Sequence, residues 1–362
     1  MKRRKTPLAA ALAGIALFSM TAASALAQDY YAGKTITVVV PFSQGGATYV
    51  SAKFLEPFLE KHIPGNPDIE VVDRPGGGSI LGANWFAQNG KPDGMTILFT
   101  TSSTANPYVL GKKEVEYDLA KMRVAYSHPF GAVAYVSPDT GISKPEDILN
   151  AKKPLIYGGI AAAASDLPGL LSFEVLKLDI KSVLGFPGRG PIRLAFERGE
   201  TNLDYQFTPV YLTQVKQLID AGKAIPLWSG GSVSADGSVT ERDPVNKDVP
   251  SVYEVYKTLY NEEPSGQAWD AFQAIAAVTY TFGLTGYMPE GTPDDVVAIF
   301  DKAIADINAD PEFQTASMEV TGGAKLVPGS VAEPLIKKAL QPSPELKKYL
   351  IDLLTSKYDV KF

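Results

Sequence analysis

The sequence contains no cysteine, which excludes disulfide bonds and thiolate chemistry. It contains only two histidines, His62 and His128, and no serine stands in a Gly-x-Ser-x-Gly motif, so a serine–histidine–acid triad has no support. His62 follows a helical stretch and suits a helix-end role, while His128 precedes a proline and suits a structural role. Neither histidine has carboxylates at metal-ligand spacing, so we expect no metal site.

Long apolar runs are missing after the amino end, and the formal net charge of −6 comes without the clustered basic residues of a nucleic-acid footprint. Residues 2–5 are basic, an apolar stretch follows from Leu8 to Phe18, and Ala25-Leu26-Ala27 is a small-x-small cleavage site. This pattern is typical of a secretory signal peptide, here residues 1–27. A retained membrane anchor is the alternative, but the apolar stretch is short and rich in alanine. We therefore expect a soluble, exported protein in the periplasm.

The first strand and helix of the mature chain surround a glycine turn. Thr35 to Val40 is rich in β-branched residues and predicts a strand, which Pro41 ends. Gly45 and Gly46 follow, and an amphipathic helical pattern begins at Thr48. Free N–H groups at such a helix start suit an anion at the carboxyl edge of a sheet. An ordinary strand-to-helix turn, in which the glycines serve geometry alone, explains the same residues equally well.

The same order of strand, donor-rich loop and helix recurs along the chain, and it predicts α/β sheets that are mainly parallel and flanked by helices. Residues 124–136 form a long apolar segment with internal breaks that suits a crossing between domains, and Ala224 to Ser229 is predicted to return to the first domain. The predicted limits are 28–128 and 230–362 for a discontinuous first domain and 129–229 for the second. Two crossing segments would permit hinge closure.

The loops offer hydrogen-bond donors without a nucleophile and base pair, which describes a binding site better than an active site. Arg189 could add a fork of donors for a carboxylate, although a solvated loop arginine is an equally good interpretation. The ligand-binding residues predicted in these loops are Ser43, Gln44, Gly45, Gly46, Ala47, Thr48, Gly78, Ser102, Ser103, Thr104, Gly159, Ala162, Ser165 and Arg189. We expect no catalytic residue and no cofactor.

Short motifs in a fixed order carry a family resemblance. They are Val40-Pro41-Phe42-Ser43-Gln44-Gly45-Gly46, Asp73-Arg74-Pro75-Gly76-Gly77-Gly78, Pro92-Asp93-Gly94-Met95-Thr96-Ile97-Leu98, Asp248-Val249-Pro250-Ser251-Val252-Tyr253-Glu254 and Pro289-Glu290-Gly291-Thr292-Pro293. In this order the chain resembles the periplasmic substrate-binding receptors of tripartite tricarboxylate transporters, the Bug or TctC-like family. The resemblance covers essentially the whole chain after the signal peptide.

The resemblance implies a two-domain periplasmic-binding-protein clamshell that holds a small carboxylate between its lobes and delivers it to membrane permease subunits. It further implies that residues 43–48 and 102–104 hold the ligand from the first domain, and that residues 159–165, Arg189 and Gln206 close over it from the second. We expect a monomer without nucleic-acid partners. An exported enzyme acting on small carboxylates and the ligand-binding component of a sensor system remain the alternatives.

Two positions depart from the pattern of the family, which commonly has an acid where Tyr49 stands and an aspartate where Gln206 stands. Loss of an acid removes repulsion toward an anion, and Tyr49 adds an aromatic face. Packing of Tyr49 at the base of the helix explains this residue slightly better than a contact with the ligand does. The segment 234–273 is longer than usual and is expected to lie at the rim.

Overall fold

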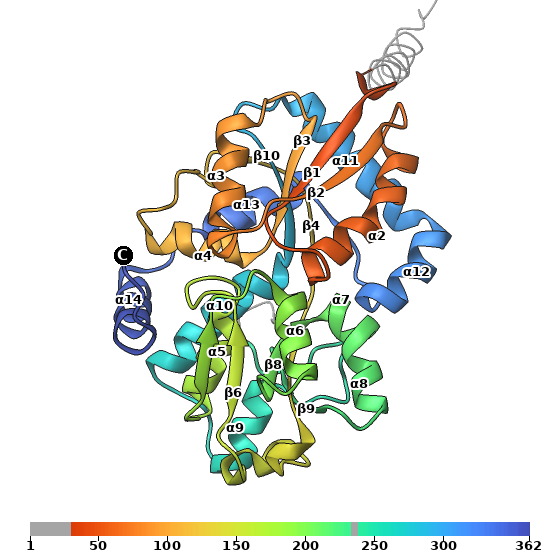
Figure 1. The fold of residues 1–362 in the computed structure, drawn as a ribbon. Coiled ribbons are helices and arrows are strands. Elements are labelled where there is room, and N and C mark those ends of the chain that lie inside the picture. The colour runs from red at the N-terminus through yellow and green to blue at the C-terminus, as the bar shows by residue number, and fades with distance from the viewer. Residues whose placement is uncertain (1–29, 233–237) are drawn as a thin grey trace, which may run out of the picture.

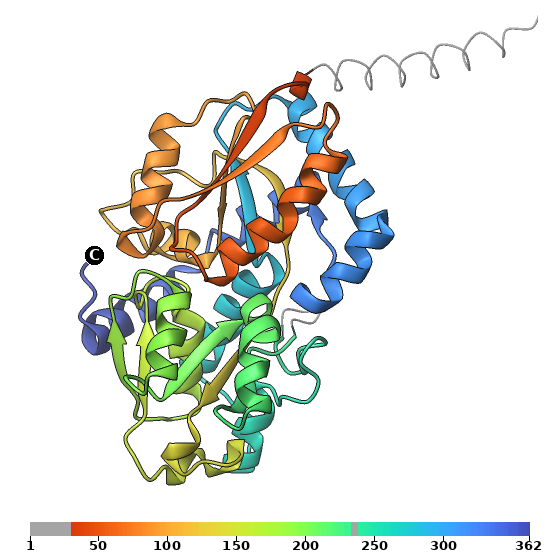
Figure 2. The same cartoon turned by 45° about the vertical axis from the view of Figure 1, so that its right-hand side comes forward.

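The structure is a computed structural model that describes residues 30–232 and 238–362. It has two lobes, each built around one β-sheet with helices on its faces (Figure 1). The second view shows the same two lobes meeting along a broad line, with the carboxyl-terminal helix at one side (Figure 2). The signal peptide predicted for residues 1–27 lies outside the described residues.

The first lobe contains a six-stranded sheet in the order β11-β4-β10-β3-β1-β2. Strand β1 pairs in parallel with β2 and β3, whereas β10 runs antiparallel to β3 and β4. The strands are β1 (Thr35–Val40), β2 (Asp68–Asp73), β3 (Thr96–Thr100), β4 (Arg123–His128), β10 (Leu284–Met288) and β11 (Val327–Pro328). The helices are α2 (Ala47–His62), α3 (Ile80–Asn89), α4 (Ser102–Leu110), α11 (Asp294–Ala309), α12 (Pro311–Thr321) and α13 (Gly329–Ala339).

The second lobe contains a five-stranded sheet in the order β7-β6-β8-β5-β9. Its strands are β5 (Ala132–Val136), β6 (Ile156–Gly159), β7 (Lys181–Leu184), β8 (Leu203–Phe207) and β9 (Ile225–Ser229). Its helices are α5 (Leu167–Val175), α6 (Arg189–Glu197), α7 (Thr208–Val210), α8 (Lys216–Asp220), α9 (Val252–Tyr260) and α10 (Gln267–Thr281), with a π-helical turn at Tyr211–Val215 and 3₁₀ turns at Pro138–Thr140 and Pro145–Asn150. Both sheets are mixed rather than mainly parallel. Strand β5, by which the chain enters the second lobe, and β10, by which it returns to the first, run antiparallel to their neighbours.

Helix α2 and strand β1 meet at the edge of the first lobe that faces the second lobe, and the sequence explains why each of them forms. Its buried residues include Ala52, Leu55, Phe58 and Leu59, which recur at helical spacing and place one apolar face of the helix on the sheet. Strand β1 is buried along most of its length, as its β-branched residues predict. The turn between them therefore lies at the carboxyl edge of the sheet and faces the second lobe (Figure 1).

Two segments connect the lobes, as the sequence predicts, but the second one lies elsewhere. The first runs from His128 to Ala132, and beside it Phe130 N–H donates to the Tyr280 carbonyl over 3.2 Å. The chain returns to the first lobe only there, between α10 and β10. The return predicted at Ala224 to Ser229 is wrong, because this stretch contains β9, which pairs with β5 inside the second sheet. A short apolar strand has the same sequence pattern in either sheet.

Helices α9 and α10 stay with the second lobe after β9, and α10 packs on α5. The structure thus places α9 and the first part of α10, which belong to the segment 234–273, with the second lobe, although the sequence predicts that this segment belongs to the first domain and lies at the rim. The domain limits drawn at 129 and 230 stay a prediction, and this packing favours a second limit near 282. The last helix, α14 (Pro344–Tyr358), contacts both α4 and α10 and so touches both lobes.

Candidate ligand-binding site

The two lobes face each other with the loops that follow their strands, and a small cavity of about 10 Å³ lies between them. This volume is close to the space that one water molecule needs. The lining residues are Phe42, Gly46, Ala47, Thr48 and Thr101 from the first lobe and Ile160, Ser165, Arg189 and Phe207 from the second. The site is therefore drawn from both lobes, and a larger ligand requires the lobes to separate.

Direct contacts hold the lobes together around this cavity. The Ser165 N–H donates to Ser103 Oγ over 2.9 Å, and Asn106 Nδ2 donates to the Ala164 carbonyl over 2.9 Å. A Cβ atom placed on Gly190 would lie 2.9 Å from the carbonyl carbon of Gly45, so the two glycine turns approach each other closely. These contacts describe a closed arrangement of the lobes.

The first lobe presents the start of α2 to the cavity. Gly46 is the N-cap residue and provides no side-chain oxygen, so no side chain caps the amides of the first helical turn. Ala47 and Thr48 are buried there and line the cavity. Uncapped amides and the positive end of the helix dipole favour an anion at this place.

The second lobe presents Arg189, whose side chain is only 4% exposed. Its Nη2 donates to Asp166 Oδ1 over 2.7 Å, its Nη1 donates to the Tyr157 hydroxyl over 3.0 Å, and Asp204 Oδ1 lies 3.9 Å from Nη1. Although burial opposes its charge, Asp166 keeps the pKa of Arg189 above its usual value. Arg189 is thus a permanent cation whose charge is already balanced by carboxylates of its own lobe.

Asp204 is fully buried, and this burial raises the pKa of its carboxyl group, while Arg189 acts in the opposite direction. It accepts hydrogen bonds from the Tyr135 hydroxyl and from Gln206 Nε2. Gln206 also donates to the Arg189 carbonyl over 2.9 Å, and its buried Oε1 has no hydrogen-bond partner in the part of the chain that the structure describes. The two aspartates, Arg189 and Gln206 therefore form one polar cluster beneath the cleft.

The structure brings some of the predicted site residues to the cavity and not others. Gly46, Ala47, Thr48, Ser165 and Arg189 line it, and Ser103 joins the lobes beside it. The buried hydroxyls of Ser43 and Ser102 have no partner among the described residues.

The other predicted residues lie around this centre. Gln44 is exposed and donates to Asp73, and the Thr104 hydroxyl bonds to Thr100 and Ser79. Tyr49 is half-buried and packs against the core, as the simpler interpretation of this residue predicts. Gly45, Gly78, Gly159 and Ala162 shape the backbone of the surrounding loops and do not line the cavity.

Sequence reasoning missed Phe42 and Phe207 in the cavity lining and Asp166 behind it, whereas Ile160 lies within the range 159–165 that the resemblance implies. Asp166 Oδ2 accepts the N–H groups of Ile160 and Ala161, which fixes the loop after β6. The position of Asp166 directly before a helix is the sequence feature that could have pointed to this residue. Within residues 30–232 and 238–362, no group of three His, Asp or Glu side chains could hold a metal ion.

The arrangement of two α/β lobes around a cleft is the fold of the periplasmic binding proteins, which confirms the predicted fold class. The structure is similar to periplasmic binding protein BugD (TM-score 0.66, 18% identity, 89% of this chain and 98% of that one). It is also similar to MatC from Rhodopseudomonas palustris with bound malate (TM-score 0.65, 21% identity, 88% and 99%) and to an R. palustris protein with adipate (TM-score 0.67, 19% identity, 88% and 97%).

Sequence comparison finds relatives in the same group, although no family model matches the chain. The chain is 36% identical to protein BugT of Bordetella pertussis over 94 residues and 32% identical to a UPF0065 protein of Pseudomonas sp. strain P51 over 165 residues. These matches span 28% and 44% of the two relatives. A UPF0065 protein of Bordetella bronchiseptica is 25% identical over 316 residues, 87% of this chain and 84% of that one. The resemblance to the Bug and TctC-like receptors is thereby confirmed.

Proposed function

We propose that the protein is an extracytoplasmic solute receptor that binds a small organic carboxylate between its lobes and delivers it to a tripartite membrane transporter. The observation that carries the proposal is the cleft, in which the uncapped start of α2 faces a polar cluster of the second lobe across a closable gap. Malate and adipate, the ligands named for two similar structures, are small dicarboxylates and support this ligand class.

Closure gives the proposal its mechanism. A ligand that touches both lobes stabilises the closed form by its higher affinity for that form, and a permease can recognise the closed receptor as loaded. The contact between Ser165 N–H and Ser103 Oγ belongs to this closed form and disappears when the lobes part. We further propose that residues 1–27 direct export to the periplasm. No helix among the described residues has the length and apolar character needed to cross a membrane.

In this proposal Arg189 orders the wall of the cleft in the second lobe. It offers the ligand only Nε, which has no hydrogen-bond partner among the described residues, because both Nη atoms already face Asp166, Asp204 and Tyr157. The charge of the ligand is stabilised mainly from the first lobe, by the amides at the start of α2. The proposed receptor binds its ligand and does not convert it, since the described residues that line the cavity include no histidine, carboxylate or lysine that could act as a base.

A thermal-shift series with malate, adipate and their diamides tests the proposal. We expect at least one of the two acids to raise the melting temperature and its diamide to leave it unchanged, because only the acid meets the helix start as an anion. Equal shifts by acid and diamide would contradict the carboxylate assignment. Following the bound acid by mass spectrometry for several hours separates the classes, since steady conversion would show an enzyme.

A further inference from the structure

A second cavity of about 270 Å³ lies where the two lobes are joined, and it shares no lining residue with the cleft. The first connecting segment contributes Pro129 to Gly131, and the end of α10, directly before the second connecting segment, contributes Tyr280 and Thr281. Thr321, the last residue of α12, and Ala324 close it from the first lobe. The cavity is smaller than most sites for drug-sized molecules and suits a ligand with a single ring or a short chain.

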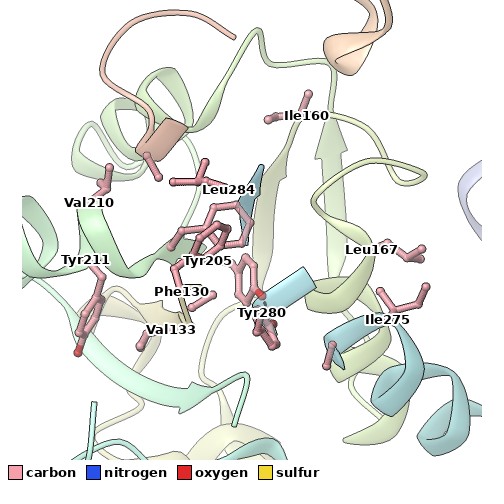
Figure 3. Close-up of a cluster of buried hydrophobic side chains, with 14 of the residues drawn as sticks. Phe130, Val133, Ile160, Leu167, Tyr205, Val210, Tyr211, Ile275, Tyr280 and Leu284 are labelled. Atoms are coloured by element: carbon pink, nitrogen blue, oxygen red, sulfur yellow. Dashed lines mark hydrogen bonds between the residues drawn. The ribbon is translucent and has the colours of Figure 1, made fainter. Parts of the chain in front are cut away.

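The walls of this hinge cavity are mainly apolar and include two aromatic rings, Phe130 and Tyr280. These two side chains lie near each other in the close-up of the buried cluster (Figure 3). Pro129, Pro244 and Val245 add further apolar surface. An aromatic wall binds an apolar body and also attracts a cation to the face of a ring.

A single carboxylate, Asp243, breaks this apolar lining, and the residue is only 3% exposed. Its Oδ1 accepts the Val245 N–H over 2.9 Å and its Oδ2 accepts Asn246 Nδ2 over 2.9 Å. Carboxylate oxygens offer about four acceptor positions, so roughly half of this capacity remains. Among the described residues, no lysine, arginine or histidine nitrogen forms an ion pair with Asp243.

A buried carboxylate without a cation is costly, and the negative charge of Asp243 acts on its surroundings. Burial raises the pKa of Tyr280, and the charge of Asp243 adds to this increase. The carboxylate lies directly against the connecting segment, since a Cβ atom on Gly131 would lie 1.8 Å from Asp243 Oδ2. The hinge cavity thus combines a buried carboxylate that has no ion-pair partner among the described residues with aromatic and aliphatic walls.

We propose that the hinge cavity is a second ligand site that binds a small organic ammonium ion. Its ammonium group donates to Asp243 and its apolar body lies against Phe130, Tyr280 and Val245. The three features that define the site are the cavity, the buried carboxylate that no cation of residues 30–232 and 238–362 pairs with, and the aromatic wall. The ligand of this site has the opposite charge to the ligand proposed for the cleft.

Calorimetric titration with benzylammonium and with benzyl alcohol, a neutral molecule of similar shape, tests this site. We expect benzylammonium to bind at least tenfold more tightly than the alcohol, because only the cation is stabilised by Asp243. In Asp243→Asn this preference is lost, whereas the control Asp139→Asn keeps it, since Asp139 is an exposed partner of Lys153. Equal affinity for the two probes, or no saturable binding of benzylammonium, overturns the proposal.

Ala324→Leu provides an independent variant that leaves Asp243 in place. The added side chain fills the cavity from the first lobe, while the Ala324 carbonyl still accepts its hydrogen bond from His128. We expect at least tenfold weaker binding of benzylammonium with an unchanged melting temperature. Unchanged binding in Ala324→Leu would place the ligand elsewhere and overturn the proposal, even if Asp243→Asn fails to fold.

Discussion

Arg189 and Asp166 form a buried ion pair beside the cleft, with 2.7 Å between Nη2 and Oδ1. Asp204 faces the same guanidinium at 3.9 Å, so one cation stands between two carboxylates. Asp166 in turn accepts two backbone N–H groups from the loop after β6. Through this chain of contacts, Arg189 holds the loop that forms one wall of the cleft.

Replacement of Arg189 is expected to destabilise the protein before it affects binding. Arg189→Met keeps much of the side-chain length but leaves Asp166 and Asp204 buried without their cation, which should cost about 3–5 kcal/mol of unfolding free energy. Urea unfolding at neutral pH measures this loss. The control Arg198→Met removes an exposed arginine paired with Glu200 and should change the free energy by less than about 0.5 kcal/mol. Equal stability of both variants would show that Arg189 has no structural role.

Closure of the lobes is expected to depend on Gly190. In Gly190→Ala the new Cβ would lie 2.9 Å from the Gly45 carbonyl carbon and 3.0 Å from the Gln44 oxygen, and these backbone atoms can retreat only if the lobes part. We expect a larger radius of gyration by small-angle X-ray scattering and a nearly unchanged unfolding free energy.

Gly169→Ala is the matched control for this experiment. Its Cβ would meet the Tyr205 ring at 3.5 Å, an ordinary contact inside the second lobe, so closure should remain normal. If Gly190→Ala is as compact as the wild type, the two glycine turns do not limit closure. At Gly46, an added Cβ would lie 3.7 Å from the nearest atom of Arg189, which is an ordinary contact distance. Gly46→Ala should therefore disturb closure less than Gly190→Ala.

The hydrogen bond from Ser165 N–H to Ser103 Oγ makes a second prediction about closure. Ser103→Ala removes the acceptor and should weaken binding of the best carboxylate from the thermal-shift series about fivefold, since such a bond contributes about 1 kcal/mol. Isothermal titration gives the ratio, with Ser330→Ala on the exposed start of α13 as the control. An unchanged dissociation constant would mean that the bound form does not contain this contact.

Local structure near the cleft was predictable because it depends on neighbours in sequence. The β-branched run of β1, Pro41 and the glycines before α2 predict a strand, a turn and a helix start, and the structure contains all three. The two connecting segments were also expected in number. The second was misplaced because Ile225–Ser229 is an apolar strand whose pairing partner, β5, is distant in sequence.

The polar cluster beneath the cleft could not be predicted in the same way. Arg189 was considered as a ligand contact or a solvated loop residue, and the structure shows it buried between two aspartates. Asp166 and Asp204 lie on different elements, and only the parallel pairing of β6 with β8 brings them together. The spacing of these residues in the sequence does not indicate that they lie close together, because their proximity depends on the strand order of the second sheet.

A last prediction concerns pH and Asp310, which joins α12 to the end of α2. Its Oδ2 accepts from Lys61 Nζ over 2.8 Å and lies 2.7 Å from His62 Nε2, and its Oδ1 accepts the Glu312 N–H. The hydrogen bonds from Lys61, then His62, hold the pKa of Asp310 well below its usual value. Because the folded state favours the ionised form, this contribution to stability is present above about pH 4, the unfolded value, and is lost as the pH falls toward the folded value.

Asp310→Asn keeps the size of the side chain and removes its charge, so it should lower the unfolding free energy at pH 7 and have a smaller effect at pH 3. Urea unfolding of both proteins at the two pH values measures the difference. Asp306→Asn is the control, because Asp306 is an exposed partner of Lys302 on α11 and makes a weak pair in water. A destabilisation by Asp310→Asn that is equally large at both pH values would show that the loss comes from packing or capping rather than from the ionised carboxylate.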